Sequence, residues 1–194
     1  MAACSVALID DGCIVASDHA AIARGHAERL VPMIAGLPEG GRCDAILVDV
    51  GPGSFTGIRV GIAAARALGF AWGVPVHGYM SLALLAAADG GRADTIVAIE
   101  GGHGEVFVGQ YAGDPLAETM APRSIPFGTA VIELAAARLI GNAAQRLVGA
   151  GVAAEPVDIL PDARAAIRLP PGLCIMPPIP FYGRGADAKP MVAG

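Results

Sequence analysis

The sequence feature that most constrains the fold is a glycine-rich loop followed by a long, almost uncharged helix. Residues 46–78 read ILVDVGPGSFTGIRVGIAAARALGFAWGVPVHG. Small residues recur every four positions, at 57, 61, 65, 69 and 73, and this spacing puts them on one ridge of an α-helix. Each glycine costs up to about 1 kcal/mol of helix propensity relative to alanine. The ridge therefore predicts close packing, either against the chain's own lobe or against a partner.

The loop before this helix has the general form of an anion site, because unpaired N–H groups and the helix dipole would face a ligand. Gly51, Gly53, Ser54 and Thr56 fit that geometry. The loop lacks the G-K-[ST] of a P-loop, and its GxGxxxG spacing is one residue longer than the dinucleotide fingerprint. Three interpretations stay open: a tight turn with Ser54 or Thr56 as helix N-cap, a nucleotide site, and a partner contact.

Composition narrows the function classes. Hydrophobic residues make up 54% and charged residues 16% of the 194-residue chain, where about 25% charged is usual. Such a surface suggests cover by another subunit. The net charge is −5 and no run of Lys or Arg occurs, so we do not expect the chain to bind RNA alone.

The cysteines and the apolar segments bear on the compartment. None of the four cysteines forms a CxxC pair, and no signal peptide is evident, which favours a reducing cytoplasm. The most apolar run, Ile58 to Trp72, contains two arginines and is too short for a membrane span of roughly 20 apolar residues.

The hydrophobic pattern predicts an α/β chain of two related lobes, although no close sequence repeat is visible. The turn-rich stretch DGGRAD, residues 89–94, is the predicted boundary, giving lobes 1–92 and 93–194. Predicted strands are 5–9 and 13–17, paired as a hairpin, then 45–50, 95–99, 105–111 and 146–149. Predicted helices are 26–35, the ridge helix, 81–88, 128–138 and 162–167, and the proline-rich tail from Leu169 is predicted to be an ordered loop.

The segment GPGSFTGIRVGIAAARALG, residues 51–69, closely resembles the signature of the TsaB (YeaZ) family of glycoprotease-like (Gcp-like) proteins. The match extends to CSVAL (4–8), GHAERLVPMI (25–34), GVPVHGYMSLALLA (73–86), GEVFVGQY (104–111) and YGRGADAKP (182–190). The resemblance implies two lobes of the actin/Hsp70/sugar-kinase (ASKHA, RNase H-like) type, each a mixed sheet flanked by helices, with the second lobe reduced.

The resemblance also implies a role. Family members are non-catalytic dimerisation subunits of the bacterial complex that attaches threonylcarbamoyl to the adenosine beside the anticodon of ANN-reading tRNAs. The implied partners are the catalytic paralogue TsaD and the ATPase TsaE at their junction, with tRNA met only through the complex. A homodimer is expected when the chain is alone, and no membrane contact is expected.

Two helices would carry the implied TsaD interface, those at about 26–35 and 57–72. The implied interface residues are His26, Arg29, Leu30, Met33, Gly57, Arg59, Gly61, Ala65, Leu68 and Trp72. Two of these keep a second interpretation. Arg59 pairs with a partner carboxylate or an anion, or is a solvated helix charge, and His26 is functional or is a polar residue of a first helical turn.

No catalytic or metal-binding residue is expected. The catalytic paralogue carries two metal-binding histidines in an H-x-x-x-H pair, and the aligned positions here are Ser81 and Leu85. The four histidines, at 19, 26, 77 and 103, have no ligand spacing. A peptidase nucleophile at Ser54 or Thr56 lacks an evident base. No cofactor is expected, although ATP or ADP shared with partners stays open, and the alternative function is an ATP-binding or ATP-hydrolysing enzyme using Gly51–Thr56.

Two departures from the family pattern matter. The family opens with a strand of the form LAIDTS, central in the first sheet, whereas this chain begins at MAACSVAL, directly at the next strand. Either the start codon is misassigned or the strand is lacking, in which case the first lobe should be unstable alone. The family's DAR after a second-lobe strand is replaced by Glu100, Gly101 and Gly102.

Overall fold

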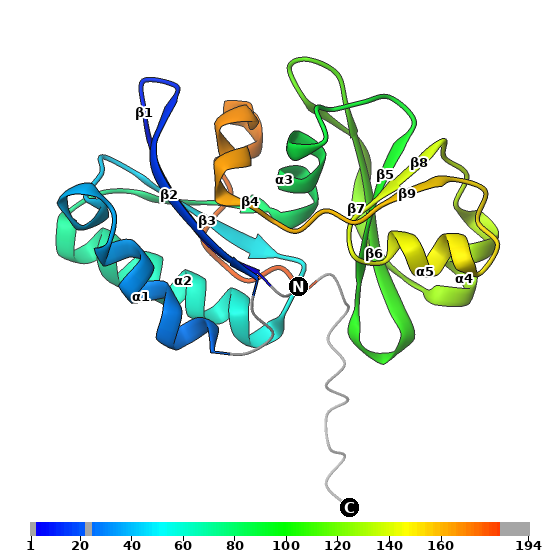
Figure 1. The fold of residues 1–194 in the computed structure, drawn as a ribbon, viewed down its shortest axis with the longest axis horizontal. Helices are drawn as coiled ribbons and strands as arrows, with labels where there is room; N and C mark the ends of the chain where they lie inside the picture. Colours follow the sequence, from blue (N-terminus) through cyan, green and yellow to red (C-terminus); the bar gives the residue numbers. More distant parts are fainter. Residues whose placement is uncertain (1–2, 22–24, 183–194) are drawn as a thin grey trace, which may run out of the picture.

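The computed structural model describes residues 3–21 and 25–182, and it has two lobes side by side (Figure 1). The first lobe contains β1 (Ala3–Asp10), β2 (Cys13–Ala21), α1 (His26–Ala35), β3 (Ile46–Gly51), α2 (Phe55–Trp72) and β4 (Val76–Met80). Helix α3 (Ser81–Ala88) leads to the second lobe, which contains β5 (Thr95–Glu100), β6 (Glu105–Ala112), β7 (Ala117–Pro126), α4 (Phe127–Glu133), β8 (Arg138–Ile140), α5 (Ala144–Gly149) and β9 (Glu155–Val157). Short 3-10 helices are η1 (Pro38–Gly41), η2 (Gly102–Gly104), η3 (Ala163–Arg168) and η4 (Pro171–Leu173).

The second lobe is built on one continuous sheet in the order β7-β6-β5-β8-β9. Its central strand β5 is antiparallel to β6 and parallel to β8. Residues Thr95 to Ile99 of β5 are all buried, as expected for a strand covered on both faces. One face packs under α4 and α5 through the buried residues Ala130, Leu139 and Leu147.

The first lobe has two separate two-stranded sheets in place of one. β1 and β2 form an antiparallel hairpin, and β3 and β4 form a parallel pair. Among the described residues, no strand pairs β1 with β3. β1 is accordingly mostly half-buried, with only Cys4 classed as buried.

Helix α3 and the segment after β9 connect the two lobes. Every residue from Ser81 to Ala87 is buried, so α3 forms the core between the lobes. At its end, Asp89 accepts from Arg138 of β8 at 2.8 Å. The chain after β9 then returns to the first lobe, where the backbone of Met176 exchanges hydrogen bonds with Gly78 of β4.

Most of the predicted elements are confirmed. The hairpin, the helices at 26–35 and 81–88, the buried strand before the loop, the ridge helix and the strands β5 and β6 lie where the pattern indicated. The short helix near 162–167 is the 3-10 helix η3. The tail prediction beyond residue 182 lies outside the described residues.

Two second-lobe predictions are wrong. Residues 146–149 are not a strand but the end of α5, whose Leu147 is fully buried. The helix predicted for 128–138 is Phe127–Glu133, and Arg138 begins β8 instead. Both errors have one cause: the position beside β5 is filled by the three-residue strand β8, which is too short to show a pattern of its own.

Candidate partner-binding face and the cavity beneath it

The glycine loop is a capped turn. The Ser54 hydroxyl accepts a hydrogen bond from the Gly57 N–H at 3.3 Å, and the Ser54 carbonyl accepts from Ile58 N–H at 2.9 Å. This confirms Ser54 as the N-cap of α2. Gly51 has a φ of 107°, and a Cβ there would lie 2.7 Å from the Phe181 carbonyl oxygen. Only glycine combines that backbone with that close approach.

Arg59 is engaged by the segment that returns from the second lobe. Its Nε donates to the Tyr182 hydroxyl at 2.8 Å, and its guanidinium carbon lies 3.7 Å from the centre of the Phe55 ring. The Phe55 and Tyr182 rings are themselves 5.3 Å apart. These contacts hold the Arg59 side chain over the first turn of α2. Its pairing with a partner carboxylate or an anion stays a prediction.

The glycine ridge faces the sheet of its own lobe. A Cβ added at Gly61 would contact Val48 of β3 at 3.7 Å, and one added at Gly69 would overlap the Val76 side chain of β4. Ala65, between them, is buried. Of the two arrangements that the sequence left open, the structure therefore has the ridge packed internally.

The opposite face of α2 points away from the lobe. It carries Ala63, Arg66, Ala67 and Phe70, all exposed, with Phe70 at 92% exposure. On α1, Val31 is 60% exposed. Figure 1 shows both helices along the outer edge of the first lobe, with no other element drawn over them. We call the exposed residues Val31, Ala63, Ala67 and Phe70 the outer face.

The residues predicted for the interface divide between this side and the interior. Arg29 and Arg59 are exposed, Leu30, Gly57, Gly61, Leu68 and Trp72 are half-buried, and Met33 and Ala65 are buried. The side chain of His26 lies outside what the structure describes. The sequence does not distinguish the outer face from the small-residue ridge as the binding side, because positions 63, 67 and 70 also share one side of a helix.

Beneath α1 and α2 lies a cavity of about 710 Å³ between the two sheets of the first lobe. Gly53, Ser54 and Gly57 contribute to its wall, as does Asp49 of β3. The Asp49 carboxylate accepts from the Ser81 hydroxyl at 2.6 Å and from the Gly51 N–H at 2.7 Å. Burial raises the Asp49 pKa to about 6, against the opposing effect of these two hydrogen bonds.

Tyr79 lies in the same wall and is buried. Burial, and then the nearby Asp49 carboxylate, raises its pKa well above the usual value for tyrosine. Burial thus disfavours the charged form of both groups, but with a pKa of about 6 the Asp49 carboxylate is still mostly ionised at pH 7. The only sequence signals for this cluster are the acid that interrupts the apolar strand 45–50 and the serine that opens an apolar helix.

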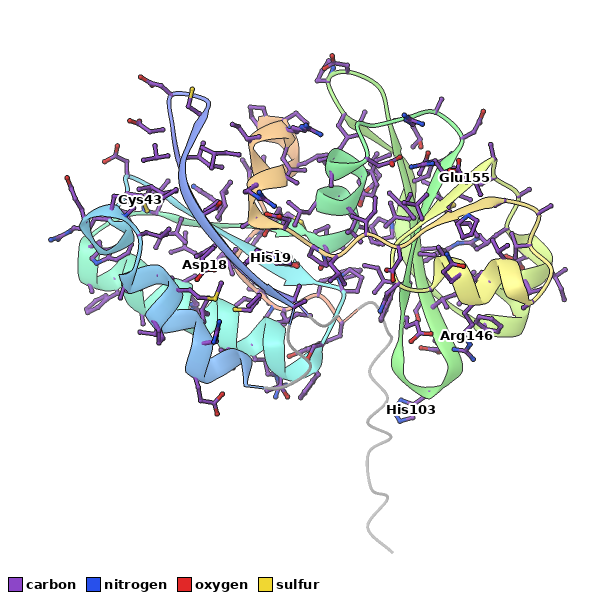
Figure 2. All side chains as sticks on the ribbon, viewed as in Figure 1. Asp18, His19, Cys43, His103, Arg146 and Glu155 are labelled. Carbon is purple, nitrogen blue, oxygen red and sulfur yellow. The ribbon has the colours of Figure 1, made fainter. Side chains whose placement is uncertain are left out.

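Potential metal ligands do not gather. Ser81 and Leu85 are both buried in α3, and no group of three His, Cys, Asp or Glu side chains within residues 3–21 and 25–182 could hold a metal ion. Figure 2 shows His19 in the first lobe and His103 at the lower tip of the second. In the described part of the chain, no helix is long and apolar enough to cross a membrane.

Comparison with known proteins gives consistent matches. The family model described as "TsaD: tRNA N6-adenosine threonylcarbamoyltransferase" matches residues 19–157. An uncharacterized protein of Mycobacterium leprae (strain TN) is 32% identical over 182 residues, which cover 88% of this chain and 48% of that protein. The "tRNA threonylcarbamoyladenosine biosynthesis protein TsaB" of Escherichia coli (strain K12) is 35% identical over 121 residues, which cover 58% of this chain and 52% of that protein. The chain thus spans about half the length of these two relatives.

A solved structure matches nearly the whole chain. "YeaZ from Pseudomonas aeruginosa" has 29% sequence identity and a TM-score of 0.75, covering 93% of this chain and 94% of that chain. The predicted α/β fold, with a mixed sheet flanked by helices, is confirmed by this likeness.

Proposed function

Because the chain belongs to the TsaD family of tRNA N6-adenosine threonylcarbamoyltransferases and their TsaB (YeaZ) relatives, we propose that it is a non-catalytic subunit of that modification system. In this proposal it binds its catalytic paralogue TsaD through α1 and α2. It thereby supports attachment of threonylcarbamoyl to the adenosine beside the anticodon of ANN-reading tRNAs. The TsaB relatives support involvement in tRNA threonylcarbamoyladenosine biosynthesis as such.

The observation that carries the proposal is the outer face. A phenylalanine at 92% exposure on a helix is costly to leave in water, because complete burial of such a side chain is worth about 1.5–3 kcal/mol. The neighbouring Ala63 and Ala67 are small, so a partner helix can approach the α2 backbone closely. Phe70 would then be the aromatic anchor, since aromatic residues, Phe included, are enriched at protein interfaces.

Two features favour a supporting over a catalytic role. Serine and leucine occupy the positions of the paralogue's histidine pair, and both are packed in α3. At the glycine loop, the Asp49 carboxylate accepts the Gly51 N–H, so negative charge lies where an anion site needs positive potential. We therefore propose no resident cofactor, with ATP or ADP entering only through partners, and give the alternative of an ATP-using enzyme lower weight.

The remaining parts of the proposal follow from the complex. TsaE joins at the junction of the two paralogues, tRNA is met only through the assembled complex, and the chain acts in the cytoplasm. When TsaD is absent, the outer face pairs with a second copy, because an apolar face that serves a close paralogue also fits the chain itself.

The test compares two substitutions of exposed apolar helix residues. Phe70→Asp is on the outer face, and Ile132→Asp, at 86% exposure on α4 of the second lobe, is the matched control. Size-exclusion chromatography with light scattering, followed by titration calorimetry, measures binding to TsaD from the same genome. We expect Phe70→Asp to weaken the complex at least 30-fold, about 2 kcal/mol, and Ile132→Asp to leave it unchanged.

Three results would contradict this. Equal binding by both variants would place the interface elsewhere. The absence of any complex with the unsubstituted, folded chain would reject the scaffold role. ATP turnover by the chain alone would favour the enzyme alternative.

A further inference from the structure

The charges on helix α2 have one sign. Arg59 and Arg66 are its only charged side chains, and no Asp or Glu occurs between Phe55 and Trp72. Both arginines are exposed, and because they are seven residues apart they lie on the same side of the helix. The helix that carries most of the outer face therefore presents positive charge, although the whole chain has a net charge of −5.

Arg66 borders the outer face directly. It follows Ala63 by three residues and precedes Phe70 by four, so its side chain neighbours both of them on the helix surface. Within residues 3–21 and 25–182, the Arg66 side chain makes no ion pair. A guanidinium in this state can donate two parallel hydrogen bonds to one carboxylate. Arg66 is therefore placed to meet an acidic residue beside whatever covers Phe70.

Arg59 adds a second positive charge two turns before Arg66. Its guanidinium contacts the Tyr182 hydroxyl and the Phe55 ring, which orient the charge but do not neutralise it. Among the ion pairs of the described residues, none includes Arg59. We call Arg59 and Arg66 the basic row.

A second copy of the chain is a poor electrostatic match for the basic row. In a two-fold symmetric dimer one surface patch meets the same patch of its partner, so pairing through the outer face brings α2 close to α2 of the second copy. Because α2 has no acidic residue, this approach brings positive charges together, which disfavours the complex. A partner helix with an apolar seam and acidic residues beside it meets no such repulsion.

We infer that Arg66 sets the partner preference of the outer face. It favours a paralogue whose docking helix is apolar with flanking Asp or Glu residues, and it disfavours pairing of the chain with itself. This inference rests on the proposed function, because it concerns binding to TsaD through the outer face. Phe70 contributes affinity to both complexes, whereas Arg66 makes them differ.

Substitution of Arg66 in the full chain tests the inference. Titration calorimetry measures binding to TsaD from the same genome, and sedimentation equilibrium measures the homodimer. Arg66→Ala should weaken TsaD binding about 5-fold, the upper value for an exposed ion pair, and should strengthen the homodimer by a similar factor. If the wild-type homodimer is too weak to detect, the Arg66→Ala homodimer should become detectable.

Two further variants separate charge from other effects. Arg66→Lys keeps the charge, so it should lie closer to the wild type than Arg66→Ala does in both complexes, which excludes an effect of the lost arginine stem. Arg92→Ala is the matched control, because Arg92 is exposed in the loop before β5 and makes no ion pair in the described part of the chain. It changes the net charge equally and should change neither affinity.

Salt dependence assigns the effects of Arg66→Ala to electrostatics. Raising NaCl from about 50 mM to about 500 mM shortens the screening length about threefold. The wild type and Arg66→Ala should therefore converge at high salt, both in TsaD binding and in self-association. Comparing the two chains removes the contribution of the remaining charges of each protein.

Three results would overturn the inference. The first is a shift of both affinities in the same direction, which would mean that Arg66 acts through packing. The second is a homodimer that Arg66→Ala weakens, since Arg66 would then meet an acid of the second copy, such as the exposed Glu28 in the first turn of α1. The third is an Arg66→Ala chain that behaves like Arg92→Ala.

These results differ from failure of the proposed function. If Phe70→Asp weakens the TsaD complex but Arg66→Ala does not, the outer face is the interface and only the role of Arg66 is wrong. If the unsubstituted, folded chain forms no complex with TsaD, the proposed function is rejected and the inference with it.

Discussion

The two lobes have the same succession of strands and helices but differ in how their sheets are completed. In the second lobe, β5 joins a hairpin to a parallel pair, and its residues Thr95–Ile99 are all buried. In the first, the equivalent hairpin and pair stay separate, and β1 is mostly half-buried. The difference shows that a central strand does more than add its own hydrogen bonds, because it buries the strands on both sides of it.

The strands of the first lobe receive hydrogen bonds from the segment after β9 in place of a central strand. Phe181 donates to the Val50 carbonyl, Met176 pairs with Gly78, and Ala163 N–H donates to the Ser5 hydroxyl at 3.0 Å. All three contacts come from the segment after β9. The two lobes are therefore coupled, and the first relies on chain that follows the second.

The largest expected difference between the lobes comes from the same truncation in each. Leu139→Ala in β8 removes a side chain with 0% exposure, whereas Leu47→Ala in β3 removes one that is 39% exposed at the cavity edge. We expect Leu139→Ala to lower the free energy of unfolding by about 2–5 kcal/mol and Leu47→Ala by less than about 1 kcal/mol. Urea denaturation, followed by circular dichroism, measures both. Equal costs for Leu47→Ala and Leu139→Ala would mean that Leu47 is as well buried in solution as Leu139 and would contradict this difference between the lobes.

The next largest effect concerns Asp49 in the wall of the cavity. Asp49→Asn keeps an oxygen that can accept from Ser81 and Gly51 but removes the charge. The folded pKa of about 6 lies above the ordinary 3.8, so the folded state binds more protons than the unfolded state between about pH 4 and 6. The wild type therefore loses stability as pH rises through that window.

The Asp49→Asn side chain does not titrate between about pH 4 and 6, so the stability of this variant does not change with the protonation of residue 49. At pH 8 it should be more stable than the wild type by about 1–3 kcal/mol, at about 1.4 kcal/mol for each pKa unit. At pH 4 the difference should vanish. Thermal unfolding at both pH values measures this, and a variant that is less stable at pH 8 would show that the Asp49 charge is stabilising.

Sequence patterns predicted the first lobe better than the second, for physical reasons. The hairpin, α1 and α2 are long and have strong periodicity or turn signals, and α2 is bounded by its caps Ser54 and Gly73. By contrast, β8 and β9 have three residues each. Strands that short are defined by what they pair with, which local sequence does not encode.

At the candidate site, too, local sequence does not encode which surfaces pack together. The sequence predicted that the ridge of α2 needs close packing, but not which side of the helix meets the lobe's own sheet, because small residues permit either. The sequence does not mark Phe70 as exposed, because an aromatic residue in an apolar helix has the pattern of a core residue. The cavity could not be predicted from pattern at all, as it depends on how the hairpin and the parallel pair are positioned.

The smallest expected effects come from alanine substitutions on the glycine ridge of α2, the first-lobe counterpart of α5. They test whether the ridge packs against β3 and β4. At Gly61 a new methyl group would have ordinary contact with Val48, at 3.7 Å, so Gly61→Ala should raise the free energy of unfolding by about 0.5–1 kcal/mol through helix propensity. At Gly69 the methyl group would overlap Val76 and approach the Val74 carbonyl oxygen at 3.1 Å. The strain of overpacking, about 1–3 kcal/mol, exceeds the propensity gain, so Gly69→Ala should lower stability by about 1 kcal/mol. Thermal unfolding of the two single variants gives opposite signs if the ridge faces β3 and β4, whereas a gain from both would mean that α2 is turned with its ridge to solvent or to a partner.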